Sequence, residues 1–151
     1  MNEQSLASTA EGLPGKSRAP DEVAVALCIY GDDLDPGEIT ALLGASPTHT
    51  HRRGDASGPR SVPFKTGAWI LEIRKSEPIY LDALYAELLA PLPAEQALWT
   101  ALARRYELRL DFAVHTDAGC GFHVSPETFA LMSSRHCAFN INIYAYGSDD
   151  A

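Results

Sequence analysis

Residues 30–44 read Tyr-Gly-Asp-Asp-Leu-Asp-Pro-Gly-Glu-Ile-Thr-Ala-Leu-Leu-Gly and join the end of a strand to a short helix. Asp35 is a residue type that accepts hydrogen bonds from the free amides of a first helical turn, and Pro36 suits the first helical position. Glu38 is spaced to reach back to the amide of the capping residue, as in a capping box. Gly44 supplies the left-handed residue that commonly follows a last turn. The stretch therefore predicts a strand followed by a helix with a defined start and end.

The rest of the chain shows two hydrophobic periods. Alternation of apolar and polar residues indicates strands with one buried face, and a run that is apolar throughout indicates a central strand. We therefore expect strands at 23–30, 69–74, 107–115, 121–124 and 138–146. Apolar residues three and four positions apart indicate amphipathic helices. We expect these at 81–89, at 94–105 and from Ser125 onward, with Phe129 buried in the last of them.

The order of these elements favours an α+β fold. We expect a mostly antiparallel sheet with helices on one face, ferredoxin-like with insertions. One domain would span 21–147, between an N-terminal tail at 1–20 and a C-terminal tail at 148–151. Residues 46–66 are rich in Gly, Pro, Ser, Arg and His, and we expect them to form a long loop.

The composition limits the classes of partner. The 151 residues carry a formal net charge of −8, from 20 acidic and 12 basic side chains. This excess of acid disfavours general binding to nucleic acid or to anionic lipid. No apolar run approaches the roughly 20 residues that span a bilayer, and residues 1–20 lack the hydrophobic segment of a secretory signal. Three scattered cysteines do not make a disulfide framework. We therefore expect a cytoplasmic protein that binds neither membrane nor nucleic acid.

Several parts of the chain are similar to one known family. They are the run from Ile29 to Thr48, Arg53-Gly54-Asp55, Trp69, Val124-Ser125-Pro126-Glu127 and the pair Ile143-Tyr144. Together these residues resemble the bacterial domain of unknown function 4279 over about 23–146, and 30–55 carry most of the likeness. The resemblance implies a small bacterial soluble protein whose family has no assigned activity. It therefore supplies no catalytic residues.

Catalytic motifs are absent from the sequence. It contains no nucleophile elbow, phosphate-binding loop, dinucleotide-binding glycine pattern or paired-histidine zinc motif. Cys120 with His123, and Cys137 with His136, are nucleophile pairs only by proximity in sequence, and no third residue is indicated to orient either base. We therefore expect no enzyme and no cofactor.

The loop at 48–65 holds the only concentration of basic residues. Its cationic side chains are Arg52, Arg53, Arg60 and Lys65. Arginine suits bidentate binding of a phosphate or of a partner's carboxylates. Alternatively, these arginines pair with the protein's own abundant acids. His49 and His51 are spaced to face the same side of an extended segment, but no third or fourth ligand is specified, so no metal site is predicted.

A second candidate surface is the polar side of the sheet. Its outward residues are Glu72, Arg74, Arg109, Asp111, Asn140, Asn142, Tyr144 and Tyr146, and Ala24, Ala26, Cys28 and Tyr30 alternate onto the same face. Tyrosine, asparagine and arginine are useful contact residues. The alternative is an ordinary hydrated face of an antiparallel sheet.

The sequence thus favours a non-enzymatic interaction module, of immunity or accessory type, that binds another protein or a second copy of itself. The alternative is a protein that binds a small polar or anionic ligand. The candidate binding residues are Arg52, Arg53, Arg60, Arg74, Arg109, Asp111, Asn140, Asn142 and Tyr144. A basic loop that encloses a cavity over the sheet would favour a ligand, whereas an open surface would favour a protein.

Overall fold

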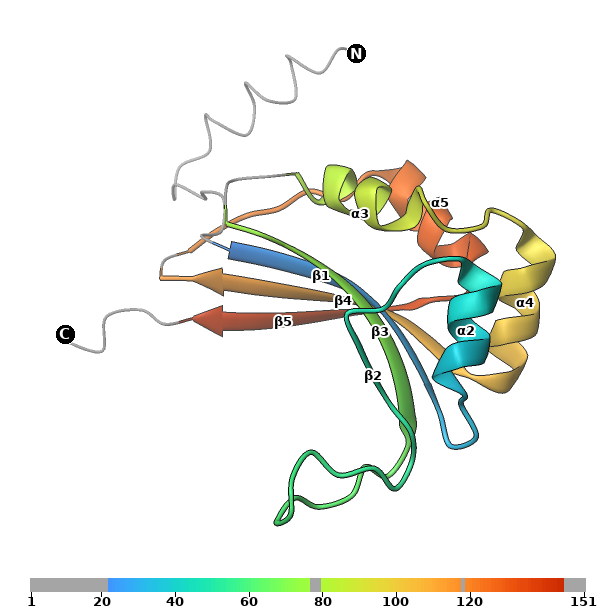
Figure 1. The fold of residues 1–151 in the computed structure, drawn as a ribbon. Helices are drawn as coiled ribbons and strands as arrows, with labels where there is room; N and C mark the ends of the chain where they lie inside the picture. Colours follow the sequence, from blue (N-terminus) through green and yellow to red (C-terminus); the bar gives the residue numbers. More distant parts are fainter. Residues whose placement is uncertain (1–21, 77–79, 118, 146–151) are drawn as a thin grey trace, which may run out of the picture.

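A five-stranded sheet carries four helices on one of its faces in the computed structural model, which describes residues 22–76, 80–117 and 119–145 (Figure 1). The strands are β1 (Glu22–Gly31), β2 (His49–His51), β3 (Gly67–Lys75), β4 (Glu107–Thr116) and β5 (Ala138–Ala145). The helices are α2 (Pro36–Leu43), α3 (Leu81–Leu89), α4 (Gln96–Arg105) and α5 (Pro126–Ser134). The expected tails at 1–20 and 148–151 lie outside the described residues.

The strand order across the sheet is β2-β3-β1-β4-β5. β1 is antiparallel to both of its neighbours, β3 and β4, and β2 is antiparallel to β3. Only β4 and β5 are parallel, and α5 lies in the crossover that such a pair requires. The α+β class and the mostly antiparallel sheet are therefore confirmed. The ferredoxin-like detail is not confirmed by this strand order.

The start of α2 follows the sequence in most respects. Asp35 Oδ1 accepts a hydrogen bond from the Gly37 amide at 3.0 Å, and Gly44 adopts a left-handed φ of 63° after the last turn. The predicted capping box is not formed, because Glu38 Oε1 instead accepts from Arg105 Nη1 at 2.8 Å. A guanidinium is a stronger donor than a backbone amide, so the ion pair to the end of α4 prevails.

The core lies between the sheet and the helices. In β1 every second residue from Val23 to Ile29 points into it and is almost fully buried. The indole nitrogens of the two buried tryptophans are satisfied there: Trp69 donates to Thr40 Oγ1 at 3.0 Å, and Trp99 donates to the Pro93 carbonyl at 2.8 Å. Because β1 is also the middle strand of the sheet, the predicted central position of the first strand is confirmed.

Three local expectations are wrong. The expected strand at 121–124 is absent: these residues join no strand of the sheet, and only the preceding Cys120 forms an isolated bridge. The expected loop at 46–66 contains the short strand β2, whose three residues are too few to show a period. Phe129 is 51% exposed, because α5 turns Thr128 and Met132 toward the core instead.

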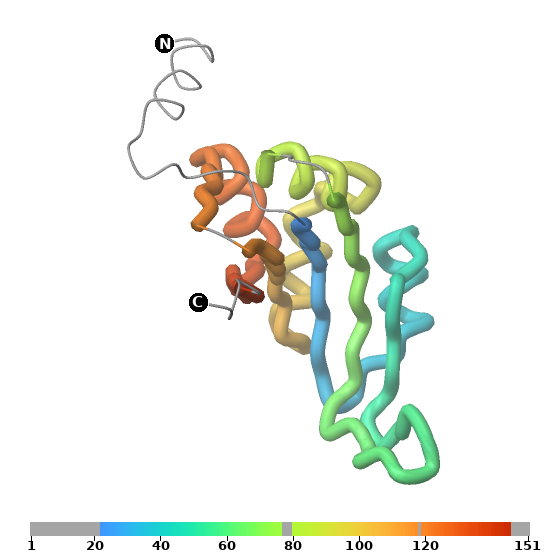
Figure 2. The backbone as a smooth tube through the Cα atoms, turned by 90° about the vertical axis from the view of Figure 1, so that its left-hand side faces the viewer, coloured from blue at the N-terminus to red at the C-terminus, as the bar shows by residue number. Residues whose placement is uncertain are grey.

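All four helices lie on the same side of the curved sheet in Figure 1, and Figure 2 shows β1 and β3 running side by side in the foreground. None of the helices within the described residues is long and apolar enough to cross a membrane. Within the same residues, one face of the sheet has no helix over it. This face holds most of the predicted site residues.

Candidate functional site

Side chains that point away from the helices on all five strands form one surface, which we call the open face. The strand register aligns them, since Ala26 lies opposite both Glu72 and Asp111, and Asp111 lies opposite Asn140. The open face comprises Glu22, Ala24, Ala26, Cys28 and Tyr30 of β1, His49 and His51 of β2, Ala68, Ile70, Glu72 and Arg74 of β3, Glu107, Arg109, Asp111, Ala113 and His115 of β4, and Ala138, Asn140, Asn142 and Tyr144 of β5. The structure thus brings together all the predicted sheet residues except Tyr146, which lies outside the described residues.

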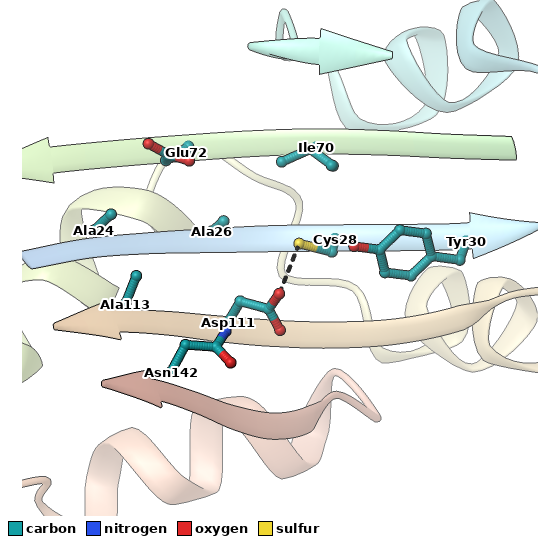
Figure 3. Close-up of a pocket in the computed structure, with 9 residues that line it drawn as sticks. All are labelled: Ala24, Ala26, Cys28, Tyr30, Ile70, Glu72, Asp111, Ala113 and Asn142. Carbon is teal, nitrogen blue, oxygen red and sulfur yellow. Dashed lines mark hydrogen bonds between the residues drawn. The ribbon is translucent and has the colours of Figure 1, made fainter. Parts of the chain in front are cut away.

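A hollow of about 160 Å³ lies in the middle of the open face (Figure 3). Its lining residues are Ala24, Ala26, Cys28, Tyr30, Ile70, Glu72, Asp111, Ala113 and Asn142. The small side chains of Ala24, Ala26 and Cys28 form the floor and are at most 7% exposed, because longer neighbours stand around them. The alternating small residues of the first strand are the sequence pattern that indicates this floor.

Arg109 is held in place by groups of the open face itself. Its Nε donates to Asp111 Oδ1 at 2.6 Å, and its Nη2 donates to Asp111 Oδ2 at 3.0 Å. The same Nη2 also donates to the Tyr30 hydroxyl at 3.1 Å, and the guanidinium lies 4.9 Å from the centre of the Tyr30 ring. These hydrogen bonds to Asp111 raise the pKa of Arg109. Most of its donor capacity is therefore used within the protein.

The thiol of Cys28 adjoins this cluster. It donates to Asp111 Oδ2 at 3.7 Å, and burial together with the Asp111 charge raises the pKa of Cys28 to about 11. Burial also raises the pKa of Cys137 to about 12. A thiol needs a lowered pKa to act as a nucleophile near neutral pH. Neither residue has the environment of a catalytic cysteine.

Arg74 is likewise paired with carboxylates of the same face. Its Nη1 lies 2.6 Å from Glu22 Oε1, and its Nη2 lies 2.9 Å from Glu72 Oε1. The hydrogen bond to Glu72, and to a smaller extent the one to Glu22, raises the pKa of Arg74. The open face carries the four carboxylates of Glu22, Glu72, Glu107 and Asp111 but only two guanidinium groups. With neutral histidines it is therefore acidic overall.

Tyr144 and the two asparagines form the β5 side of the open face. The ring of Tyr144 stacks on His115 of β4, with ring centres 4.8 Å apart. Asn140 and Asn142 are partly exposed and lie opposite Asp111 and Ala113. These residues add an aromatic surface and amide donors beside the carboxylates.

The basic loop is attached to the start of α2 rather than to the open face. Arg52 Nη2 lies 3.0 Å from Asp35 Oδ1, and Arg53 Nη1 lies 3.6 Å from Asp32 Oδ2. Arg60 is exposed. No residue from 52 to 66 lines the hollow. The structure therefore favours the alternative in which these arginines pair with the protein's own acids, and it does not bring the loop residues together with the sheet residues.

The two histidines of β2 face the same side, as their spacing predicts. His49 Nε2 and His51 Nδ1 are 3.0 Å apart, and the His51 ring stacks on Phe64 with ring centres 3.5 Å apart. Burial, and then the charge of His49, lowers the pKa of His51. Among the residues described by the structure, no group of three or more His, Cys, Asp or Glu side chains is arranged to hold a metal ion.

Comparison with known proteins places the chain in a family described as a domain of unknown function. Residues 21–146 match the family of proteins described as a domain of unknown function, DUF4279, which confirms the resemblance seen in the sequence. No curated protein matches the chain, and no solved structure matches it. The functional argument therefore depends on the geometry of the site.

Proposed function

We propose, from the premise that this chain belongs to the family of the domain of unknown function DUF4279, that it binds another protein over the open face of its sheet. One observation carries the proposal: a sheet face with a floor of small side chains and a polar, aromatic border has no described helix over it. Tyrosine, asparagine and arginine side chains around a shallow floor suit a protein contact surface.

The charges of the open face define the chemistry of this partner. Arg74 and Arg109 already bind carboxylates of their own face, so they offer little to an anionic partner. The four carboxylates of the open face outnumber its two guanidinium groups, and Glu107 and the side-chain amide oxygens of Asn140 and Asn142 remain as acceptors. A neutral or basic polypeptide segment, rich in donors, complements this face better than an acidic one.

A small anionic ligand is less well supported at this site. Ligand pockets commonly enclose roughly 300–1,000 Å³, and the hollow is about 160 Å³ and open to solvent. The charged residues that line it are Glu72 and Asp111, whereas the arginines that pair with them do not line it, so the hollow presents no cationic side chain to an anion. The basic loop that would supply a cation is paired with the acids next to α2.

The narrower form of the proposal is a non-enzymatic module of immunity or accessory type in the cytoplasm. The raised thiol pKa values of Cys28 and Cys137 support a role without nucleophilic catalysis. The unpaired state of all three cysteines supports a reducing compartment.

Co-purification from native cells tests the proposal. Ala26→Arg projects a long cation from the floor into the hollow, and Ala101→Arg makes the same change at an exposed position of α4. We expect the unmodified chain and Ala101→Arg to retain the same partner, and Ala26→Arg to bind it at least about tenfold more weakly, a loss of about 1.4 kcal/mol. Circular dichroism checks that both variants fold.

Two outcomes contradict the proposal. One is a partner that binds Ala26→Arg as tightly as it binds the unmodified chain. The other is the absence of any protein that co-purifies with the unmodified chain at its native abundance.

A further inference from the structure

β5 is an edge strand of the sheet, and it lacks the features that usually prevent an edge strand from pairing with another chain. It is the last strand in the order and pairs with β4 alone, so within the described residues no strand lies along its outer side. The opposite edge is protected differently, since β2 spans only three residues and Thr48 Oγ1 accepts the next free amide, that of Glu72, at 3.1 Å. An unpaired strand edge presents backbone donors and acceptors whose natural complement is another strand.

The composition of this edge strand lacks the usual protection against pairing. Residues 138–145 read Ala-Phe-Asn-Ile-Asn-Ile-Tyr-Ala and contain no charged residue, proline or glycine. Exposed edges in natural proteins commonly carry lysine, proline or a bulge that blocks pairing. The chain as a whole is 21% charged and has a net charge of −8, so most of its surface repels a second copy. β5 is a place where two copies can meet without opposing like charges.

Exposed apolar side chains lie on β5 itself and on α5, which packs against it. Nine large hydrophobic residues are exposed among those that the structure describes, and six of them lie between residues 122 and 144. Ile141 and Ile143 point to the helix side of β5, yet they are 39% and 60% exposed. The exposed Phe129 ring adjoins Phe139 of β5, with ring centres 6.3 Å apart. Alternation along the expected strand at 138–146 places both isoleucines on its inward side. They do face the helices, but they remain exposed.

From these observations we propose that two copies of this chain associate by antiparallel pairing of their β5 strands. The two-fold axis would run perpendicular to the sheet, so the helices of both copies lie on the same side. In an antiparallel pair, directly opposed residues point to the same face of the sheet. The axis must therefore pass midway between the two copies of one residue, which lie directly opposite each other. This symmetry makes the interface self-complementary.

Both registers that use seven residues of β5 place like side chains together. Centred on Asn142, the pairing sets Ile141 opposite Ile143 of the second copy, and Asn142 opposite itself. Centred on Ile141, it sets Ile141 opposite itself and Asn140 opposite Asn142. In each register the isoleucines meet on the helix side and the amides meet on the open face. Apolar and amide cross-strand pairs of this kind stabilise a sheet.

The dimer would join the two open faces into one wider surface. The pairing continues the sheet from one copy into the next, and Asn140, Asn142 and Tyr144 then lie on both sides of the junction. This arrangement does not depend on the proposed partner, because the β5 edge and the hollow are made of different atoms. The two proposals can therefore fail separately.

The oligomeric state of the full chain tests the dimer. Ile143→Lys places a cation on an exposed edge residue, where it would lie opposite Ile141 or Phe139 of the second copy, depending on the register. Val62→Lys makes a matched change at an exposed loop position. By size-exclusion chromatography with light scattering at micromolar concentration, we expect the unmodified chain and Val62→Lys at twice 16.3 kDa. We expect Ile143→Lys at 16.3 kDa, with an unchanged circular dichroism spectrum.

Hydrogen exchange gives a second, local reading. In the unmodified dimer the outward amides of β5 should exchange at least about tenfold more slowly than in Ile143→Lys, because pairing protects backbone amides. A monomeric unmodified chain overturns the proposal. So does a dimer that persists in Ile143→Lys, or one that Ala26→Arg dissociates, since the latter would place the interface on the open face.

Discussion

Replacement of Asp111 by alanine removes the carboxylate that accepts hydrogen bonds from both Arg109 and Cys28 on the open face. The side chains of Arg109 and Asp111 are 31% and 20% exposed, and two nitrogen–oxygen contacts of 2.6 Å and 3.0 Å join them. The pair is therefore more shielded than an ordinary surface ion pair, yet it is not buried. A double-mutant cycle with Arg109→Ala measures its coupling energy.

The expected magnitude lies between two reference cases. Exposed ion pairs contribute about 0.2–1 kcal/mol, and hydrogen bonds to charged groups contribute about 1.5–3 kcal/mol. Partial exposure places this pair near the boundary, so we expect a coupling energy of about 1–1.5 kcal/mol. Asp111→Ala alone should cost about 2 kcal/mol, because it also leaves the guanidinium without its acceptor.

Urea unfolding of the four proteins of the cycle supplies the measurement. Because the pair is partly covered, raising the salt concentration should weaken the coupling only in part. A coupling energy below about 0.3 kcal/mol would refute the reasoning, since it would place the pair among freely solvated surface charges. The claim that Arg109 is withdrawn from binding anions would then lose its basis.

Three further predictions concern Cys28, the two loop arginines Arg52 and Arg53, and Gly31. Burial raises the pKa of Cys28 from 9.0 to about 11, so the thiol ionises at lower pH in the unfolded chain than in the folded one. The free energy of unfolding should therefore fall between about pH 9 and 11. In urea titrations, Cys28→Ala should make this fall shallower. Arg52→Ala with Arg53→Ala should lower that free energy by no more than about 1 kcal/mol and leave partner capture unchanged, because both ion pairs are exposed. Gly31→Ala should destabilise the fold by about 1–3 kcal/mol in the same assay, since its new Cβ would lie 2.5 Å from the Tyr106 ring; an unchanged midpoint would contradict this.

Local patterns predicted most of the fold. The run from Val23 to Ile29 is apolar on both faces because β1 has strands on both sides and helices above, and its open-face members are small. Strand order is a different matter, because alternation specifies the face of a residue and not the neighbouring strand. The parallel pairing of β4 and β5 therefore had no local signal. Neither had the exposure of Ile143, which depends on how far α5 extends.

The sequence predicted which face of the sheet carries the candidate site residues, but not which of these side chains bind one another. Alternation correctly placed Arg109, Asp111 and Asn140 on one surface. It did not show that Arg109 and Asp111 bind each other, although residues two apart on a strand share a face. The partners of Arg52 and Arg53 come from the β1–α2 junction, about 20 residues earlier in the chain. Such pairings depend on the tertiary fold, so sequence spacing alone left both alternatives for the loop open.

The side-chain amides offer the most direct test of the open face as a contact surface. The chain has only three asparagines and two glutamines, and the structure describes Asn140 and Asn142 on the open face and Gln96 on α4. In a nitrogen-15 correlation spectrum, addition of the co-purified partner should shift or broaden the side-chain signals of Asn140 and Asn142 and leave Gln96 unchanged. A response at Gln96 without one at either asparagine would contradict the account, because the partner would then be bound on the helical side.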